Sequence, residues 1–273
     1  AAGVVISPTD LIDFTPVQFE TGGTQMVTQY EMNSVEEAGV LKMDFLGIRN
    51  LSILGDAIKI VEKTRGVKIN LQTIPWDDKK TFDMLARGET YGLFQLGGSG
   101  MTRYIEELKP TSIFDIMAMI ALFRPGPMAV IPEYISRKHG KSRVKYYHPK
   151  MQSYLDKSFG LLVYQDDLLF TAMELAGYTW ESVDKFRKAV GKKIPAEMAK
   201  QHVIFVAGCQ KHSQMSQPEA EKIWELFEPF QGYGFNKAHA ASYAVVAYET
   251  AYMKAHFPEE YMAAVLSAEA GDI

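Results

Sequence analysis

Two residues of opposite charge, Lys42 and Asp44, are the first candidates for chemistry in this sequence. They lie in the stretch 41–46, where they alternate with apolar residues in the pattern of a short β-strand. Neighbouring side chains of a strand point to opposite faces, so Lys42 and Asp44 share one face. Asp44 is therefore a candidate ligand for a divalent cation. Phosphoryl or nucleotidyl transfer through two cations normally needs at least two acids, so we expect further ligands from elsewhere.

A basic block at 185–193 is the second candidate site. If this block is helical, Lys185, Lys188 and Lys192 fall at spacings of three and four residues and share one face. Arg187 extends the positive charge to the adjacent side, and the block itself contains no acid. A triphosphate or a nucleic-acid backbone is a natural counterion for such a surface. These residues leave open the alternative of a solvent-exposed helix that only aids solubility.

The third candidate is the glycine-rich loop 232–235 and the helix expected after it. Asn236 is a suitable N-cap, so free backbone N–H groups and the helix dipole are expected to face an anion. Lys237 and His239 lie on the first turn of that helix. A lone histidine is more often structural than functional, but the loop favours a role for His239. Tyr243, further along the helix, is a candidate for stacking on bases or for packing in the core.

A second acid-free run spans residues 137–150. A run of this kind is either a solvated face or a contact surface for the phosphate backbone of DNA. The predicted DNA-binding residues are Arg137, Lys138, Lys141, Arg143 and Lys145.

Length and composition set the limits for these candidates. The chain has 273 residues, 47% of them hydrophobic, which is enough for one large domain or two ordinary ones. The net charge of −4 excludes a uniformly basic protein, and the single cysteine, Cys209, favours a reducing compartment. The longest apolar run, 116–123, is far shorter than the roughly 20 residues that a membrane span needs. Because the chain lacks a basic leader and an initiating methionine, we expect a piece of a longer protein.

The expected elements predict an α+β fold with few strands and many helices. Short strands are predicted at 3–8, 25–30 and 41–46, and an extended segment at 91–96. A helix ending near Leu85 has Asp77 as its predicted N-cap, and Ser216 with Glu219 forms a predicted capping box. The prolines at 125 and 127 end the helix before them. The other predicted helices span 48–63, 101–108, 112–123, 166–176, 180–190, 195–206 and 237–256, with a last helix after Pro258.

Six motifs, taken together and in this order, closely resemble the alpha subunits of bacterial DNA polymerase III, the family C replicative polymerases. The motifs are Ala2-Gly3-Val4-Val5-Ile6, Lys42-Met43-Asp44-Phe45-Leu46-Gly47, Phe94-Gln95-Leu96, Ala121-Leu122-Phe123-Arg124-Pro125-Gly126-Pro127, Arg187-Lys188-Ala189-Val190-Gly191-Lys192-Lys193 and Gly232-Tyr233-Gly234-Phe235-Asn236-Lys237-Ala238-His239. The resemblance covers essentially the whole chain. It implies that residues 1–50 are the second portion of a β-rich palm domain of the DNA polymerase beta type, and that residues 51–273 are mainly α-helical fingers.

The resemblance also implies roles for single residues. Asp44 matches the third metal-binding aspartate of the family, and Lys42 matches the lysine beside it in the active site. Arg187 and Lys188 match the paired basic residues that meet the triphosphate of the incoming nucleotide. His239 matches a histidine near the incoming sugar. The remaining residues implied to bind the nucleotide are Lys192, Lys193, Tyr233, Phe235, Asn236 and Lys237.

Cofactors and partners are likewise implied by the resemblance. The expected cofactor is a pair of Mg²⁺ ions held by Asp44 and by two further aspartates on an earlier Asp-x-Asp segment that this chain lacks. The expected substrates are primer–template DNA and a deoxynucleoside triphosphate. A sliding clamp, a clamp loader and a proofreading exonuclease are expected partners of the whole protein, in the bacterial cytoplasm at the nucleoid and with no membrane contact.

Three positions depart from the family pattern. Lys188 stands where a second arginine is expected, which keeps the charge but loses the planar, bidentate fork. Ala238 replaces a frequent serine, and Gly97-Gly98-Ser99 replaces a more polar run. A bare glycine run of this kind is a weak signal for phosphate binding and more often a simple turn.

The residues also suggest two alternatives to polymerase function. The first is a non-catalytic helical module that binds nucleic acid or a partner protein through its basic segments. The second is a small nucleotidyltransferase that is complete in itself, and the lack of a second acid at Asp-x-Asp spacing near Asp44 argues against it.

Overall fold

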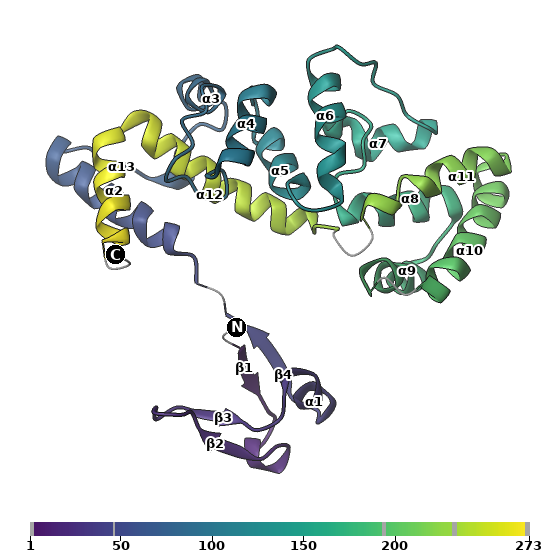
Figure 1. The fold of residues 1–273 in the computed structure, drawn as a ribbon, viewed down its shortest axis with the longest axis horizontal. Helices are drawn as coiled ribbons and strands as arrows, with labels where there is room; N and C mark the ends of the chain where they lie inside the picture. The colour runs from purple at the N-terminus through teal and green to yellow at the C-terminus, as the bar shows by residue number, and fades with distance from the viewer. Residues whose placement is uncertain (1–2, 46, 193–194, 231–233, 271–273) are drawn as a thin grey trace. The chain divides into compact units, whose positions relative to one another are not determined.

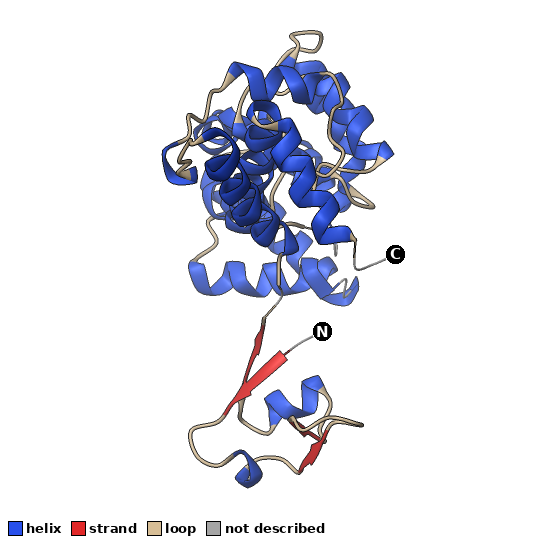
Figure 2. Ribbon diagram, turned by 90° about the vertical axis from the view of Figure 1, so that its left-hand side faces the viewer, coloured by secondary structure: helices blue, strands red, loops and turns tan. Residues whose placement is uncertain are grey.

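The computed structural model describes residues 3–45, 47–192, 195–230 and 234–270. It divides into two compact units, Ala1–Arg49 and Asn50–Ile273, which we call the β unit and the helical unit. Strands occur in the first, and the second is helical throughout its described regular elements (Figure 2). The predicted α+β fold, a few N-terminal strands followed by many helices, is confirmed.

The β unit consists of two antiparallel pairs of strands, β1 with β4 and β2 with β3 (Figure 1). In the first pair Gly3 lies opposite Asp44, and Ile6 lies opposite Leu41. The predicted strands at 3–8, 25–30 and 41–46 are all present in shorter form. The sequence analysis missed β2 and α1, which are short. The elements are β1 Gly3–Ile6, a 3₁₀ turn Leu11–Asp13, β2 Val17–Phe19, β3 Met26–Thr28, α1 Met32–Glu37 and β4 Leu41–Asp44.

Few side chains are buried in the β unit. Among its described residues only Val35 and Val40 are buried hydrophobics. Leu41 and Met43, on the apolar face of β4, are 61% and 42% exposed. A two-stranded ribbon of this kind has little internal packing to support it.

The helical unit carries the larger core. Its helices are α2 Arg49–Arg65, α3 Lys79–Ala86, α4 Ser99–Leu108, α5 Ile113–Leu122, α6 Ile131–Lys138, α7 Gln152–Leu155, α8 Gln165–Ala176, α9 Trp180–Lys192, α10 Pro195–Ser213, α11 Gln217–Glu225, α12 Lys237–His256 and α13 Pro258–Glu269. Short 3₁₀ segments are Leu71–Thr73, Pro127–Val130, Pro149–Met151, Asp156–Ser158 and Glu228–Phe230. No helix in the described ranges is both long enough and apolar enough to cross a bilayer.

Several starts and ends of these helices are as predicted, but α10 runs to Ser213, beyond its predicted end at 206. The predicted Ser216–Glu219 capping box is present at the start of α11, and α5 ends before the prolines as predicted. The cap of α3 is Asp78 and not Asp77, because it is Asp78 whose carboxylate accepts from Thr81 N at 2.8 Å. The stretch 91–96 forms turns instead of the predicted extended segment, with Gln95 in the left-handed region.

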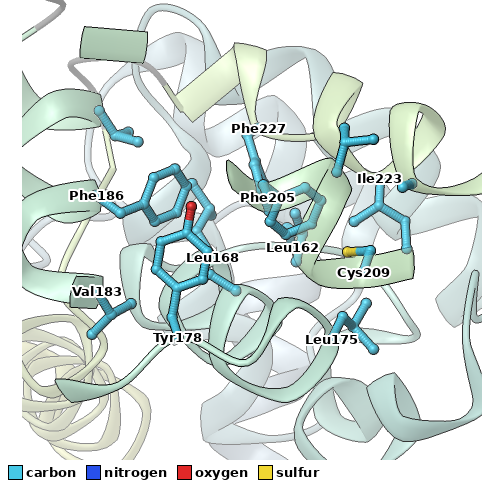
Figure 3. Packing of buried hydrophobic residues seen from close by; sticks show 14 of the residues in the cluster. Leu162, Leu168, Leu175, Tyr178, Val183, Phe186, Phe205, Cys209, Ile223 and Phe227 are labelled. Atoms are coloured by element: carbon cyan, nitrogen blue, oxygen red, sulfur yellow. The ribbon is translucent and has the colours of Figure 1, made fainter. Parts of the chain in front are cut away.

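Helices α8 to α11 enclose an aromatic core (Figure 3). Phe186 of α9, Phe205 of α10 and the nearby Phe227 are each fully buried. The ring centroids of Phe186 and Phe227 are 5.5 Å apart, and those of Phe205 and Phe227 are 5.1 Å apart. The buried side chain of Phe186 thus anchors α9 in this core, while the neighbouring Arg187 and Lys188 are exposed.

The long helix α12 packs on α3 and α5 (Figure 1). Its buried alanines, such as Ala244 and Ala247, let the helix backbones approach closely. Tyr248 is also buried, and its hydroxyl donates to Pro75 O at 2.6 Å while accepting from Asp78 N at 3.1 Å. This packing fixes α12 along its length and so positions its N-terminus.

Candidate functional site

The N-terminus of α12 has the predicted cap. Asn236 Oδ1 accepts from His239 N at 2.9 Å, and α12 begins at Lys237. Tyr233 lies outside the described residues. The expected helix with Lys237 and His239 on its first turn is therefore present.

Two N–H groups of this turn, those of Lys237 and His239, already have acceptors within the protein, which corrects the expectation of an open anion site. Lys237 N donates to Asp166 Oδ2 at 2.7 Å, and Asn236 Nδ2 lies 3.5 Å from the same oxygen. A carboxylate of the protein thus already occupies the position that the helix dipole favours for an anion. We therefore do not place a phosphate on the backbone of the first turn of α12.

Five side chains from three separate parts of the sequence form a continuous chain of contacts beside this helix end. The guanidinium carbon of Arg124 lies 4.0 Å from the ring centroid of Phe235. Phe235 and His239 have centroids 5.0 Å apart, and His239 and Tyr243 have centroids 4.1 Å apart. Tyr243 in turn lies 5.1 Å from Phe94. We call these five residues the ring stack, and His239 stands at its centre with an exposed side chain.

Arg124 anchors the ring stack to α5. Its Nε donates to Ala121 O and its Nη2 to Ile120 O, each at 2.8 Å, so it caps the C-terminal carbonyls of that helix. Burial lowers the pKa of Arg124, but an arginine remains charged at neutral pH. The sequence analysis used Arg124 and Phe94 only as marks of family resemblance and missed their contact with the loop. The only sign in the sequence that these two residues could belong to the site was their place in two of the six motifs.

Lys237 turns away from the ring stack. Its Nζ lies 5.4 Å from the ring centroid of Tyr164, and it lines a small cavity together with Asp167. Asp167 Oδ2 accepts from the backbone N–H groups of Val163 and Tyr164, while its Oδ1 is buried without a hydrogen-bond partner. Burial raises the pKa of Asp167 to about 6.

The cations of α9 are exposed, but they share an acid that the sequence analysis overlooked. Asp184 Oδ1 lies 2.8 Å from Arg187 Nη2, and Asp184 Oδ2 lies 2.8 Å from Lys188 Nζ. Hydrogen bonds from Lys188 and Arg187 lower the pKa of Asp184. Lys185 is likewise 3.8 Å from Glu181. The block itself contains no acid, as predicted, but Glu181 and Asp184 just before it pair with three of its cations.

Even so, Arg187 and Lys188 meet at one carboxylate with 44% and 60% of their side chains exposed. The two cations are held side by side and remain open to an anion. The side chain of Lys192 and the whole of Lys193 lie outside the described part of the chain.

The predicted DNA-binding residues fall into two groups. Arg137 and Lys138 lie in the last turn of α6, and each side chain is only 9% exposed. Arg137 contacts Glu133 at 2.7 Å and donates to Phe159 O, and Lys138 Nζ lies 2.8 Å from Asp115. These two cations are engaged within the protein. The other three predicted residues, Lys141, Arg143 and Lys145, are exposed in the segment that follows α6.

In the β unit, Lys42 and Asp44 share a face of β4 as predicted. Lys42 Nζ lies 3.0 Å from Asp44 Oδ1 and 3.3 Å from Oδ2. The hydrogen bond to Asp44 raises the pKa of Lys42. Gly3 lies opposite Asp44, where an added Cβ would contact Asp44 Oδ1 at 3.4 Å. The Asp44 side chain is 53% exposed, so its oxygens are accessible.

A complete metal site is not present in the described residues. No group of three or more His, Cys, Asp or Glu side chains in that part of the chain is arranged to hold a metal ion. Asp44 can offer the oxygen ligands of a single carboxylate, which is less than Mg²⁺ requires for a two-ion centre.

Comparisons with known proteins bear on what these groups do. A family model described as the bacterial DNA polymerase III alpha subunit finger domain matches residues 50–213. A second, described as the bacterial DNA polymerase III alpha NTPase domain, matches residues 1–47. The boundaries and the palm and fingers labels predicted for residues 1–50 and 51–273 remain predictions.

Full-length relatives match across the whole chain. DNA polymerase III subunit alpha of Thermus aquaticus is 45% identical over 277 residues, which cover 100% of this chain and 22% of that protein. The corresponding subunit of Escherichia coli strain K12 is 42% identical over 280 residues, covering 98% of this chain and 24% of that protein. The chain thus spans about a quarter or less of these relatives. The ring stack lies partly beyond the finger model but within these matches.

The predicted family is confirmed, because the finger model alone matches more than half of the residues. The chain belongs to the family of bacterial DNA polymerase III alpha subunits, and it contains the finger domain of that family.

Proposed function

We propose that this chain binds the incoming deoxynucleoside triphosphate for a template-directed DNA polymerase and supplies one acidic residue to its active site. The reaction is attack of a primer 3′-hydroxyl on the α-phosphate, with release of pyrophosphate. The observation that carries the proposal is the ring stack, which brings three separated family motifs together around an exposed His239. A helical module without a nucleotide site has no need of that convergence.

The triphosphate is assigned to Arg187 and Lys188, with Lys192 and Lys193 nearby in sequence. Asp184 holds the first two cations together, so an arriving phosphate meets a preformed pair. His239 is assigned to the sugar, with Phe235 and Asn236 beside it. Tyr233 and Lys237 are assigned to the nucleotide from the family resemblance alone. Phosphoryl transfer depends mainly on alignment and on charge stabilisation, and rigidly held cations and rings supply both.

Asp44 is assigned as one metal ligand and Lys42 as its neighbour in the active site. Because the described residues do not form a complete site, two further aspartates must come from outside them for a pair of Mg²⁺ ions. What this chain itself does is present an accessible carboxylate whose orientation is fixed by the ammonium of Lys42. We expect the chain alone to have no primer-extension activity.

Primer–template DNA is the proposed partner of the segment after α6. Lys141, Arg143 and Lys145 are exposed there and can contact phosphates. Arg137 donates to Lys145 O at 3.3 Å and to Phe159 O at 2.9 Å, so we assign it to shaping this segment. Interactions with a sliding clamp, a clamp loader and a proofreading exonuclease, in the bacterial cytoplasm, are proposed from family membership alone.

The test is to replace Arg187 and Lys188 together by alanine in the complete polymerase that we propose contains this chain. We expect the KM for the nucleotide to rise at least about tenfold, with DNA affinity changed less than about twofold. Lys59→Ala, at an exposed ion pair of α2, is the matched control. An even loss of DNA affinity with no change in nucleotide KM would instead support the non-catalytic binding module.

A further inference from the structure

The N-terminus of α12 is held by an acid of another helix, Asp166 in the first turn of α8. We propose that Asp166 is a positioning residue that sets the place of His239 and the ring stack against the incoming nucleotide. The inference rests on the proposed function of the stack, and it adds a residue to which neither the motifs nor the family resemblance assigned a role.

The contact is made by consecutive residues on both sides. Gln165 N donates to Phe235 O at 2.9 Å, and Asp166 Oδ2 accepts from Lys237 N at 2.7 Å. Asn236 lies between Phe235 and Lys237 in the sequence, and its Nδ2 is 3.5 Å from the same oxygen of Asp166. The chain from 235 to 237 is therefore bound to the start of α8 by three polar contacts.

These contacts reach His239 through the N-cap. Asn236 uses its Nδ2 toward Asp166 and its Oδ1 to accept from His239 N at 2.9 Å. Fixing the amide of Asn236 fixes the backbone of His239, because the two groups of the amide are rigidly linked. The ring of His239 is then held between Phe235 and Tyr243.

A charged acceptor suits this position better than a neutral one. Asp166 lies in the first turn of α8 and also faces the first turn of α12, so two helix dipoles favour its negative charge. Packing adds to the fit, since an added Cβ on Gly234 would lie only 3.3 Å from Gln165 Cβ. The loop is thus pressed against α8 at the point where Asp166 binds it.

A competing reading is that Asp166 is only a placeholder, which a phosphate of the substrate displaces from the helix end. The two interpretations predict opposite changes in the nucleotide KM when Asp166 is replaced by alanine. Removal of a placeholder frees an anion site and lowers the nucleotide KM. Removal of a positioning residue loosens His239 and raises the KM.

The experiment uses Asp166→Ala and Asp166→Asn in the complete polymerase. We expect alanine to raise the nucleotide KM about five- to tenfold, with kcat lowered less than about threefold and DNA affinity unchanged. Asparagine should restore most of the KM, because its carbonyl oxygen still accepts from Lys237 N. If the alanine variant does not fold, Asp166→Ser takes its place, with an intermediate KM expected. Glu219→Ala, which removes the capping acid of α11, is the matched control and should leave the KM unchanged.

Three outcomes would overturn the inference. A fall in KM for Asp166→Ala would identify a displaced placeholder. An unchanged KM in that variant, while His239→Ala and Arg187→Ala both raise it, would leave the proposed function standing without a role for Asp166. An unchanged KM in His239→Ala and Arg187→Ala as well would refute the proposed function itself.

Discussion

In the β unit the carboxylate of Asp44 stands on a two-stranded ribbon with one ammonium beside it, whereas in the helical unit His239 is held by a stack of rings, a cap and a second helix. The β unit has two buried hydrophobic residues in its described part, neither of them in the ribbon, and the helical unit has an aromatic core. A binding site for a substrate needs such rigidity, because alignment supplies much of the rate enhancement. A metal ligand on a ribbon obtains its geometry only together with the other ligands.

The largest expected effect separates chemistry from binding. Asp44→Asn in the complete polymerase should reduce primer extension by at least about a thousandfold, since a neutral amide is a poor ligand for Mg²⁺. DNA affinity and nucleotide affinity should change less than about threefold, because the groups assigned to them lie in the helical unit. Asp10→Asn, in an exposed loop of the same unit, serves as the control. Substantial extension by the Asp44 variant would remove this residue from the metal site.

The second prediction compares one phenylalanine from each unit. Phe186 is fully buried in the core of the helical unit, and Phe19 is 65% exposed in the β unit. Phe186→Ala should lower the free energy of unfolding by about 3–5 kcal/mol, and Phe19→Ala by less than about 0.5 kcal/mol. Urea unfolding of the two variants measures both values. Equal losses would show that the two units do not differ in packing as described.

The third prediction concerns pH and the helical unit alone. Burial raises the pKa of Asp167 to about 6, above its unfolded value near 4. Between pH 4 and pH 6 the folded state therefore binds more protons than the unfolded state. The contribution of Asp167 to the free energy of unfolding is complete below pH 4 and is lost as the pH rises through about 6. From pH 4 to pH 7.5 the loss should be about 2 kcal/mol, and Asp167→Asn should abolish it. The measurement is the urea midpoint of the wild type and of the variant at both pH values. An equal loss of stability with pH in the two proteins would contradict the expectation.

The smallest expected effect refines the triphosphate assignment. Lys188→Arg restores the planar fork expected in the family and should lower the nucleotide KM about threefold, because two parallel bonds to a phosphate become possible. The same exchange at Lys185, which is paired with Glu181, should change the KM less than about 1.5-fold. Equal shifts in steady-state assays of the two variants would point to a general charge effect and not to a specific phosphate contact.

Local rules predicted much of this structure. The alternation of side chains along a strand placed Lys42 and Asp44 on one face of β4. The apolar periodicity, caps and prolines located most of the helices. The cap of α3 shows the limit of such rules. Asp77 and Asp78 both fit the sequence pattern of an N-cap, and only the hydrogen bond from Thr81 N identifies Asp78 as the cap. Asp184 lies just before the basic block 185–193, but a helix brings residues three and four positions apart together. Asp184 therefore reaches Arg187 and Lys188 across that boundary.

Spacing places His239 and Tyr243 side by side on α12, but it could not predict the rest of the ring stack or the Asp166 contact. Phe94, Arg124, Phe235 and Tyr243 come from separate elements, and only the packing of α12 on its neighbours brings them together. Asp166 precedes its partner Lys237 by 71 positions. The expectation of an open anion site at α12 failed for the same reason, because a helix start read alone does not reveal which distant acid already occupies it.

The most direct test of the central claim is a structure of the complete polymerase with primer–template DNA and a nonhydrolysable deoxynucleoside triphosphate. We predict that an Asp44 carboxylate oxygen lies within about 5 Å of an α-phosphate oxygen, because a shared Mg²⁺ lies about 2 Å from each ligand. Arg187 and Lys188 should contact the β- or γ-phosphate in the same structure. An Asp44 carboxylate at more than roughly twice that distance from the α-phosphate would contradict the account.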